Sequence, residues 1–156
     1  MKIHILRAAI VLLILPFAIA LTQCGSDTTA SDVEEYLVDV HWIMDEAADI
    51  ASKVSALYTS AANLSVSEIL QRCVTYKDDY KNLQGRLMIL ETPSECSQLR
   101  MHLMDTFTYC QQELTEFAAA YSTGDISRLF EAERYYDKAN RAILLAATEW
   151  ERLSGD

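Results

Sequence analysis

Residues 33–61 read VEEYLVDVHWIMDEAADIASKVSALYTSA, and this stretch decides the fold. Its apolar side chains recur at alternating steps of four and three residues without a break: Val33, Leu37, Val40, Met44, Ala47, Ala51, Val54, Tyr58 and Ala61. Steps that average about 3.5 residues keep one face of a helix turned toward a nearly parallel neighbour, as in helical bundles and coiled coils. We therefore expect a long helix that packs lengthwise against others.

Three further segments carry a similar apolar stripe. The stripes are Val66, Ile69, Cys73, Tyr76, Tyr80, Leu83, Leu87 and Leu90; Leu103, Phe107, Cys110, Leu114, Phe117 and Tyr121; and Leu129, Ala132, Tyr136, Ala139, Ile143, Ala146, Trp150 and Leu153. We expect helices over 32–62, 66–91, 93–122 and 126–153. Because the connections are short, neighbouring helices should run antiparallel. The sequence thus predicts an all-α, antiparallel up-down-up-down four-helix bundle over residues 32–153.

Capping signals set these boundaries. The stretches Ser31–Glu34, Ser65–Glu68 and Thr92–Glu95 each match the capping box, in which a hydroxyl and a glutamate three residues later satisfy amides of the first turn. Gly124 is typical of the residue that ends a helix, and Asp125 of the residue that caps the next one.

The N-terminus has the order of a secretory signal: positive charge, apolar core and processing site. Lys2 and Arg7 precede an apolar run over residues 8–21, which ends in Leu21-Thr-Gln-Cys24. Leu21 and Cys24 resemble the lipobox of bacterial lipoproteins. This resemblance implies that residues 1–23 are a signal peptide, that Cys24 is lipidated and that it becomes the first residue of the mature protein. Residues 24–31 are small and polar, which is typical of a flexible linker.

Two alternatives to lipidation remain open. Cleavage after Ala18-Ile19-Ala20 would release a secreted or periplasmic protein. A retained apolar segment would anchor the chain, although the run is short for a spanning helix, which needs about 20 residues. With lipidation, the protein is expected outside the cytoplasm, attached to the cell membrane or outer membrane by its N-terminal lipid.

The charge of the chain excludes one class of partner. The 156 residues include 13 basic and 23 acidic side chains. Removal of residues 1–23 takes away two basic side chains and no acidic ones, which leaves a net charge of −12. Such a surface repels phosphate backbones, so we expect no nucleic acid partner. It also repels anionic lipid headgroups, so membrane contact should come from the anchor.

The cysteines offer a candidate disulfide. If the second and third helices fold back about residue 92, Cys73 lies opposite residue 111, next to Cys110. In an oxidising compartment this placement favours a Cys73–Cys110 bridge. The alternative is two buried free thiols that pack as small hydrophobic groups. If Cys24 is not lipidated, a Cys24–Cys96 bridge is also plausible.

The sequence carries no recognisable catalytic motif. It lacks the Cys-x-x-Cys-His run of covalent haem attachment and the paired Glu-x-x-His of di-iron bundles. No serine or cysteine nucleophile has a convincing base, and four glycines leave no phosphate-binding loop. We expect no catalytic residues and no cofactor, and we interpret the chain as a non-enzymatic binding or structural protein of the cell envelope with a protein or small-ligand partner.

One cluster supports an alternative function as a soft-metal protein. When residues of the first and third helices are compared by their height along the bundle axis, His41 lies within about one turn of His102. Imidazole and thioether side chains are ligands that suit copper, and thioethers select Cu(I). The candidate ligands are His41, Met44, Met101, His102 and Met104. The competing interpretation is that these methionines fill gaps in the core.

Trp42 is a candidate partner contact. It points away from the stripe that carries Val40 and Met44, onto the acidic side of its helix. Tryptophan is favoured at the centres of protein interfaces. Alternatively, Trp42 covers a flank of the bundle.

Overall fold

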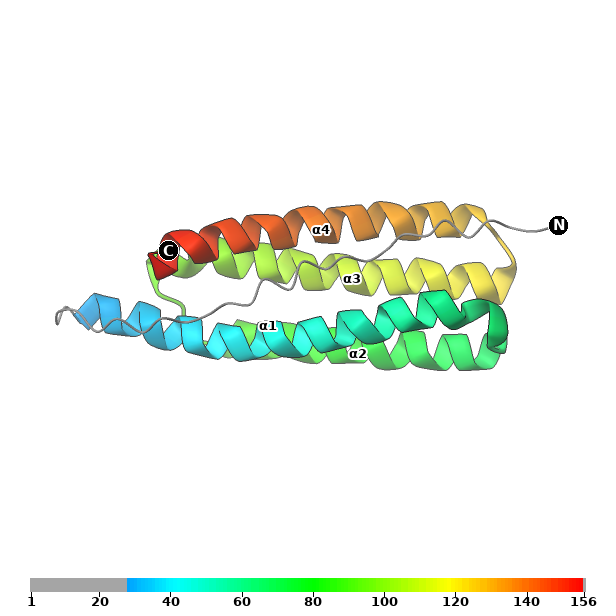
Figure 1. Ribbon diagram of the computed structural model, residues 1–156, viewed down its shortest axis with the longest axis horizontal. Coiled ribbons are helices and arrows are strands. Elements are labelled where there is room, and N and C mark those ends of the chain that lie inside the picture. Colours follow the sequence, from blue (N-terminus) through cyan, green and yellow to red (C-terminus); the bar gives the residue numbers. More distant parts are fainter. Residues whose placement is uncertain (1–27, 156) are drawn as a thin grey trace.

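The computed structural model describes residues 28–155, and this part of the chain is all-helical. Its four long helices are α1 (Thr28–Ser60), α2 (Val66–Ile89), α3 (Ser97–Thr123) and α4 (Ser127–Ser154). Single 3-10 turns follow α1 at Ala61–Asn63 and precede α3 at Ser94–Cys96. The helices lie along the long axis of the molecule and pack against one another (Figure 1). The predicted all-α class with four packed helices is confirmed.

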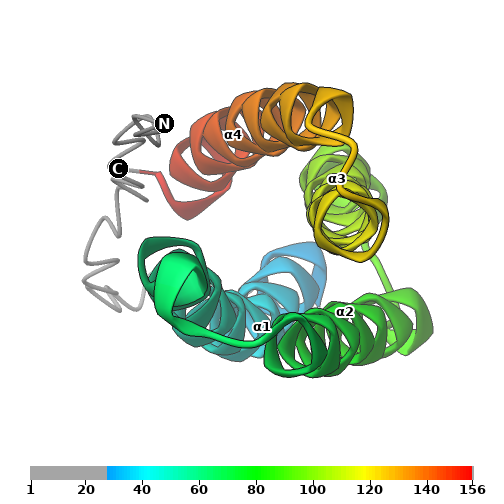
Figure 2. The ribbon, with the colours of Figure 1, turned by 90° about the vertical axis from the view of Figure 1, so that its right-hand side faces the viewer.

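The four helices contact one another to different extents. Viewed along the bundle, α3 lies between α2 and α4, and α1 lies beside α2 (Figure 2). Helix α3 packs along most of α4 and along α2, whereas α1 meets α4 over a much shorter stretch. The Trp150 ring, near the end of α4, makes one of these contacts, with its centroid 6.2 Å from that of His41 on α1.

Small side chains explain the close packing of α4 on α3. The buried residues of α4 are alanines except for one tryptophan near its end: Ala132, Ala139, Ala142, Ala146 and Trp150. The distance between two packed helices depends on the side chains at the contact. A row of methyl groups therefore lets α4 lie close to α3 along most of its length.

The buried face of α1 is wider than the predicted seam. Four further residues at seven-residue spacing are buried: Tyr36, Ile43, Ile50 and Leu57. Met44 and Tyr58, which belong to the predicted seam, are only half-buried against the core. A helix that packs in a bundle needs an apolar stripe wider than the a/d seam of a coiled coil, so each heptad contributes an extra core residue.

The capping box between α1 and α2 and the end of α3 at Gly124 are confirmed, whereas the residue before α4 is Ile126 and not the predicted cap Asp125. The Ser65 side chain accepts a hydrogen bond from the Glu68 amide at 3.3 Å, and the Glu68 carboxylate accepts one from the Ser65 amide at 2.8 Å. Gly124 ends α3 with φ +73°, a left-handed conformation that favours glycine. Asp125 accepts a hydrogen bond from the Ser127 amide at 3.0 Å and so serves the first turn of α4.

The other two capping predictions are wrong. Helix α1 begins at Thr28, so Ser31–Glu34 lies within the helix, and residues 28–31 belong to α1 rather than to the linker. Thr92 does not cap α3, because its hydroxyl donates to the Leu90 carbonyl at 3.1 Å. A 3-10 turn intervenes, and α3 begins at Ser97.

The predicted signal peptide and Cys24 lie outside the described residues. Within residues 28–155, no helix combines the length and apolar character needed to cross a membrane.

Candidate functional site

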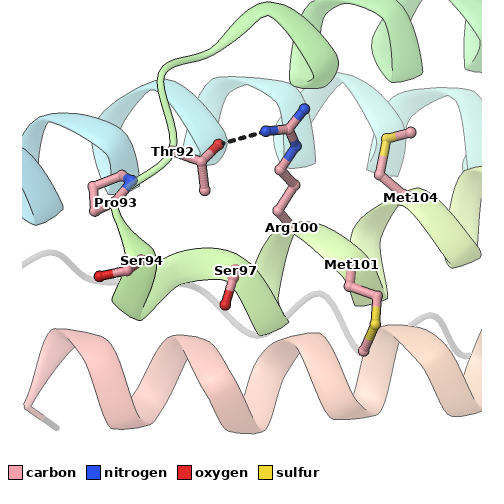
Figure 3. A pocket seen from close by; sticks show the side chains of 7 residues that line it. All are labelled: Thr92, Pro93, Ser94, Ser97, Arg100, Met101 and Met104. Atoms are coloured by element: carbon pink, nitrogen blue, oxygen red, sulfur yellow. Dashed lines mark hydrogen bonds between the residues drawn. The ribbon is translucent and has the colours of Figure 1, made fainter.

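A pocket of about 460 Å³ lies at the corner where the chain passes from α2 to α3 (Figure 3). Its walls come from the connecting segment and the first two turns of α3: Thr92, Pro93, Ser94, Ser97, Arg100, Met101 and Met104. The lining is mostly apolar, with three hydroxyls and one guanidinium. Pockets for small molecules typically have volumes of about 300–1,000 Å³ and combine apolar walls with a few polar groups. We define these seven residues as the corner pocket.

Arg100 is the charged residue of the corner pocket. Its guanidinium donates to the Thr92 hydroxyl at 3.0 Å and to the Met88 carbonyl at 2.8 Å. The second bond satisfies one of the last carbonyls of α2, which have no partner within the helix. A guanidinium carries five N–H donors, so these two bonds leave donors for a further acceptor. No carboxylate within residues 31–155 forms an ion pair with Arg100.

Tyr36 of α1 lies behind this corner. Its side chain is only 3% exposed, and its hydroxyl has no hydrogen-bond partner of adequate geometry among the described residues. Burial raises the pKa of Tyr36, while the neighbouring Thr92 hydroxyl and the Arg100 charge oppose part of that rise. Cys96 is fully buried beside it. The Tyr36 hydroxyl thus lies near Thr92 and Arg100, two residues that line the corner pocket.

A second polar cluster lies in the core around Glu113. This α3 residue is 5% exposed, and the Tyr58 hydroxyl of α1 donates a 2.6 Å hydrogen bond to its Oε1 atom. Burial raises the pKa of Glu113 to about 7, and the hydrogen bond from Tyr58 opposes a larger rise. The Phe117 ring lies 4.3 Å from the Tyr58 ring, centroid to centroid. Glu113 can therefore take up or release a proton close to neutral pH.

Two thiols lie near Glu113, and both stay protonated at neutral pH. Burial and the nearby Glu113 charge raise the pKa of Cys73 to about 11 and raise the pKa of Cys110 well above its usual value. The Tyr80 hydroxyl donates a hydrogen bond to the Cys110 sulfur, which opposes part of that rise. Because the thiolate is the nucleophile, buried thiols of this kind are inert.

The predicted Cys73–Cys110 disulfide is not formed. Cys73, Cys96 and Cys110 are free thiols, and they are the cysteines that residues 28–155 contain. The second predicted pairing, Cys24–Cys96, involves a residue outside the described part of the chain.

The register of α2 against α3 explains this correction. The Lys77 ammonium lies 3.4 Å from the Thr115 hydroxyl, and the Gln84 amide donates to the Thr108 hydroxyl at 2.9 Å. These pairs place Cys73 at the same height along the bundle as a residue about two and a half helical turns beyond Cys110. The chain folds back near Cys96 rather than at residue 92, because the 3-10 turn lengthens the connection.

Two of the five predicted metal ligands lie at the corner pocket, and the soft-metal site stays a prediction. Both Met101, which is 45% exposed, and Met104 line the corner pocket, but their side chains point to opposite sides of α3 (Figure 3). Met44 and His102 are half-buried and line no part of that pocket. Within the described residues, no group of three or more His, Cys, Asp or Glu side chains is placed to hold a metal ion.

His41 contacts an acidic residue and two aromatic rings. Its Nε2 atom lies 3.5 Å from the Asp45 carboxylate, and its ring centroid lies 5.9 Å from that of Trp42. Its Nδ1 atom is buried and has no hydrogen-bond partner within residues 31–155. His41 is therefore the one candidate ligand for which the structure records an unsatisfied ring nitrogen.

Trp42 is 61% exposed and lies one turn after Val38, which is also exposed. The prediction that Trp42 points away from the core is confirmed. Its role as a partner contact stays a prediction.

Sequence reasoning missed the two residues that dominate these clusters. Glu113 could have been found, because it continues the four-and-three spacing of Leu103, Thr106, Cys110 and Phe117 on α3 and so had to face the core. Arg100 carried no such signal. Its place in the corner pocket depends on the path of the chain between α2 and α3, which no local pattern indicates.

Comparisons with protein-family models, with characterised proteins and with solved structures find no match for this chain. We therefore infer its function from its own residues.

Proposed function

We propose that this protein is an exported, lipid-anchored helical bundle with a non-enzymatic binding role in the cell envelope. The observation that carries the binding role is the corner pocket, where Arg100 lies among mostly apolar walls without an ion-pair partner in residues 31–155. Pockets with apolar walls and a few placed polar groups are typical of ligand sites. Cys24 would hold the lipid anchor.

The proposal includes an antiparallel up-down-up-down order of helices. Contacts between α2 and α3 support it, because Lys77 meets Thr115 and Gln84 meets Thr108, so that later residues of one helix meet earlier residues of the other. Contacts of α3 and its preceding turn with α4 follow the same rule: Arg128 pairs with Glu116 at 2.7 Å, and Arg152 donates to the Glu95 carbonyl at 3.0 Å.

The chemistry of the interior favours binding over catalysis. The thiols of Cys73 and Cys110 are held protonated by burial, so neither is an activated nucleophile. Glu113 titrates near neutral pH, but its carboxyl group bonds to Tyr58 inside the core and does not line the corner pocket. The acid and the pocket are thus separate features.

Fractionation of native cells tests the anchored part of the proposal. The wild-type chain should sediment with membranes, and Cys24→Ser should move to the soluble extracytoplasmic fraction. The matched control is Ser26→Ala, which changes the same segment without removing the thiol and should stay with membranes. Equal distribution of wild type and Cys24→Ser would contradict lipid anchoring at this residue.

The alternative function is soft-metal binding, and one observation favours it. The buried Nδ1 atom of His41 has no hydrogen-bond partner in the described part of the chain, so it is free to act as a ligand. Anaerobic titration of Cu(I) into the wild type and into a His41→Ala, His102→Ala double variant tests this function. Uptake that is stoichiometric in the wild type and lost in the variant would support it, and equal, weak uptake would end it.

A further inference from the structure

Arg100 is held in place with part of its hydrogen-bonding capacity unused. The bonds to the Met88 carbonyl and the Thr92 hydroxyl fix the guanidinium at the wall of the corner pocket. Its remaining N–H groups face no carboxylate of residues 31–155 within ion-pair distance. In a chain with 23 acidic and 13 basic residues, a fixed cation without an acidic partner is suited to an anion from outside.

The other walls of the pocket fit an apolar group. Pro93, Met101 and Met104 supply the apolar surface, and Met101 extends toward α4 while Met104 extends away from α4 (Figure 3). Methionine side chains are flexible and polarizable, so they adapt to ligands of different shape. The Ser97 hydroxyl lies at the same pocket and can donate to an anionic head group, whereas the Ser94 hydroxyl already donates to the Glu95 carboxylate at 3.0 Å.

The neighbouring charges favour an anion with a single negative charge over one with two. Arg100 is the one basic residue that lines the corner pocket. The exposed acids Glu91 and Glu95 flank the pocket-lining segment in sequence, so a doubly charged phosphate ester would be repelled more strongly than a carboxylate. The planar guanidinium also matches the two oxygens of a carboxylate.

We propose that the corner pocket binds a small monocarboxylate with an apolar tail, whose carboxylate pairs with Arg100 and whose tail contacts Met104. This inference rests on the proposed binding function and assigns the chemical class of its ligand. Arg100 has two roles: it donates a hydrogen bond to the Met88 carbonyl at the end of α2, and it pairs with the anion.

Titration of hexanoate and of its neutral analogue hexanamide tests the inference. The full chain is reconstituted in lipid nanodiscs, and binding is measured by saturation-transfer difference NMR with empty nanodiscs as the blank. We expect saturable binding of hexanoate and at least tenfold weaker binding of hexanamide. Equal affinities for the two probes, or no saturable binding of hexanoate, would overturn the inference.

Two variants locate the binding site. Arg100→Gln removes the charge but retains an amide that can bond to the Met88 carbonyl. Ser97→Asp adds a negative charge to the pocket and leaves the hydrogen bonds of Arg100 to Met88 and Thr92 unchanged. An aspartate in the first turn of a helix is also compatible with folding. Both variants should weaken hexanoate binding at least tenfold. If Ser97→Asp binds hexanoate as the wild type does, the pocket is not the site.

Matched controls carry the same charge changes elsewhere. Ser67→Asp adds an acid to the exposed first turn of α2, and Arg72→Gln removes an exposed cation from the same helix. Both should bind hexanoate within twofold of the wild type, and tenfold weakening in either control would contradict the assignment to the corner pocket. Membrane fractionation of Cys24→Ser does not depend on this pocket, so failure of the ligand assignment is distinguishable from failure of the anchoring proposal.

Discussion

The Tyr58 hydroxyl donates a 2.6 Å hydrogen bond to Oε1 of Glu113 and thereby joins α1 to α3 inside the core. It is the one hydrogen bond to the Glu113 side chain within residues 31–155. A buried carboxylate with a single donor remains costly to ionise, which is why burial raises the pKa of Glu113 to about 7. Burial therefore disfavours the ionised form of Glu113, and the hydrogen bond from Tyr58 offsets part of that cost.

This pKa predicts that the protein loses stability as the pH rises. The pKa of Glu113 is raised from 4.5 to about 7, so the folded state binds more protons than the unfolded state between these values. The free energy of unfolding should fall from about pH 4.5 to about pH 7 and contribute no further slope above that range, with a total on the order of 3 kcal/mol. The raised pKa values of Cys73 and Tyr58 keep these neighbours neutral throughout the window.

Urea unfolding of Glu113→Gln at pH 5 and pH 8 checks this prediction. The variant should lose most of the pH dependence and be more stable than the wild type at pH 8. The control is Glu133→Gln, which changes an exposed glutamate of α4 and should keep the wild-type slope. A Glu113→Gln variant with the same pH dependence as the wild type would show that Glu113 does not titrate near neutrality.

Tyr58→Phe should extend the pH dependence to higher pH and increase its total. The Tyr58 hydroxyl stabilises the ionised carboxylate, so its loss should raise the pKa of Glu113 further. At pH 8 the free energy of unfolding should drop by about 1–3 kcal/mol, and the loss at pH 5 should be smaller. The measurement is urea unfolding at both pH values, with the half-buried Tyr136→Phe as the control. Equal losses at the two pH values would argue against a bond to the charged form.

Ser65→Ala should destabilise the start of α2. The substitution leaves the Glu68 amide without its side-chain acceptor, a loss typically worth about 1 kcal/mol. Thermal unfolding at constant pH measures the change. Ser67→Ala, two residues later and without a capping role, should change the free energy of unfolding by no more than about 0.5 kcal/mol. Equal effects of the two substitutions would contradict the observed capping box.

Ala146→Leu should weaken the packing of α4 on α3. The Ala146 methyl is fully buried, so three extra carbon atoms have no space, and we expect a loss of about 1–3 kcal/mol. Urea unfolding compares this variant with Ala56→Leu, which enlarges an exposed alanine of α1 and should be nearly neutral. A neutral Ala146→Leu would mean that α4 does not depend on small side chains for its position.

The helices were predictable because the signal for each is local. The stripe that includes Val40 and Val54 repeats within a single helix, and the capping box at Ser65 marks the start of the next one. The width of the α1 core face was not predictable in full, because burial of Ile43 and Leu57 depends on helices from other parts of the sequence.

The geometry of the α2–α3 connection was not predictable from these patterns. The predicted register assumed that α2 and α3 fold back at residue 92 and ignored the 3-10 turn at Ser94–Cys96. This turn shifts α3 along α2 and so separates Cys73 from Cys110. The corner pocket depends on the same turn, since Thr92 and Arg100 meet only because the chain takes this path. Sequence periodicity therefore located the core but not the candidate site.

The intact mass of the protein extracted from membranes of its native host tests the central claim most directly. The account predicts a chain that begins at Cys24, lacks residues 1–23 and carries the added mass of acyl groups on that cysteine. An unmodified chain that begins at Met1 and is recovered from the cytosol would contradict both export and lipid anchoring.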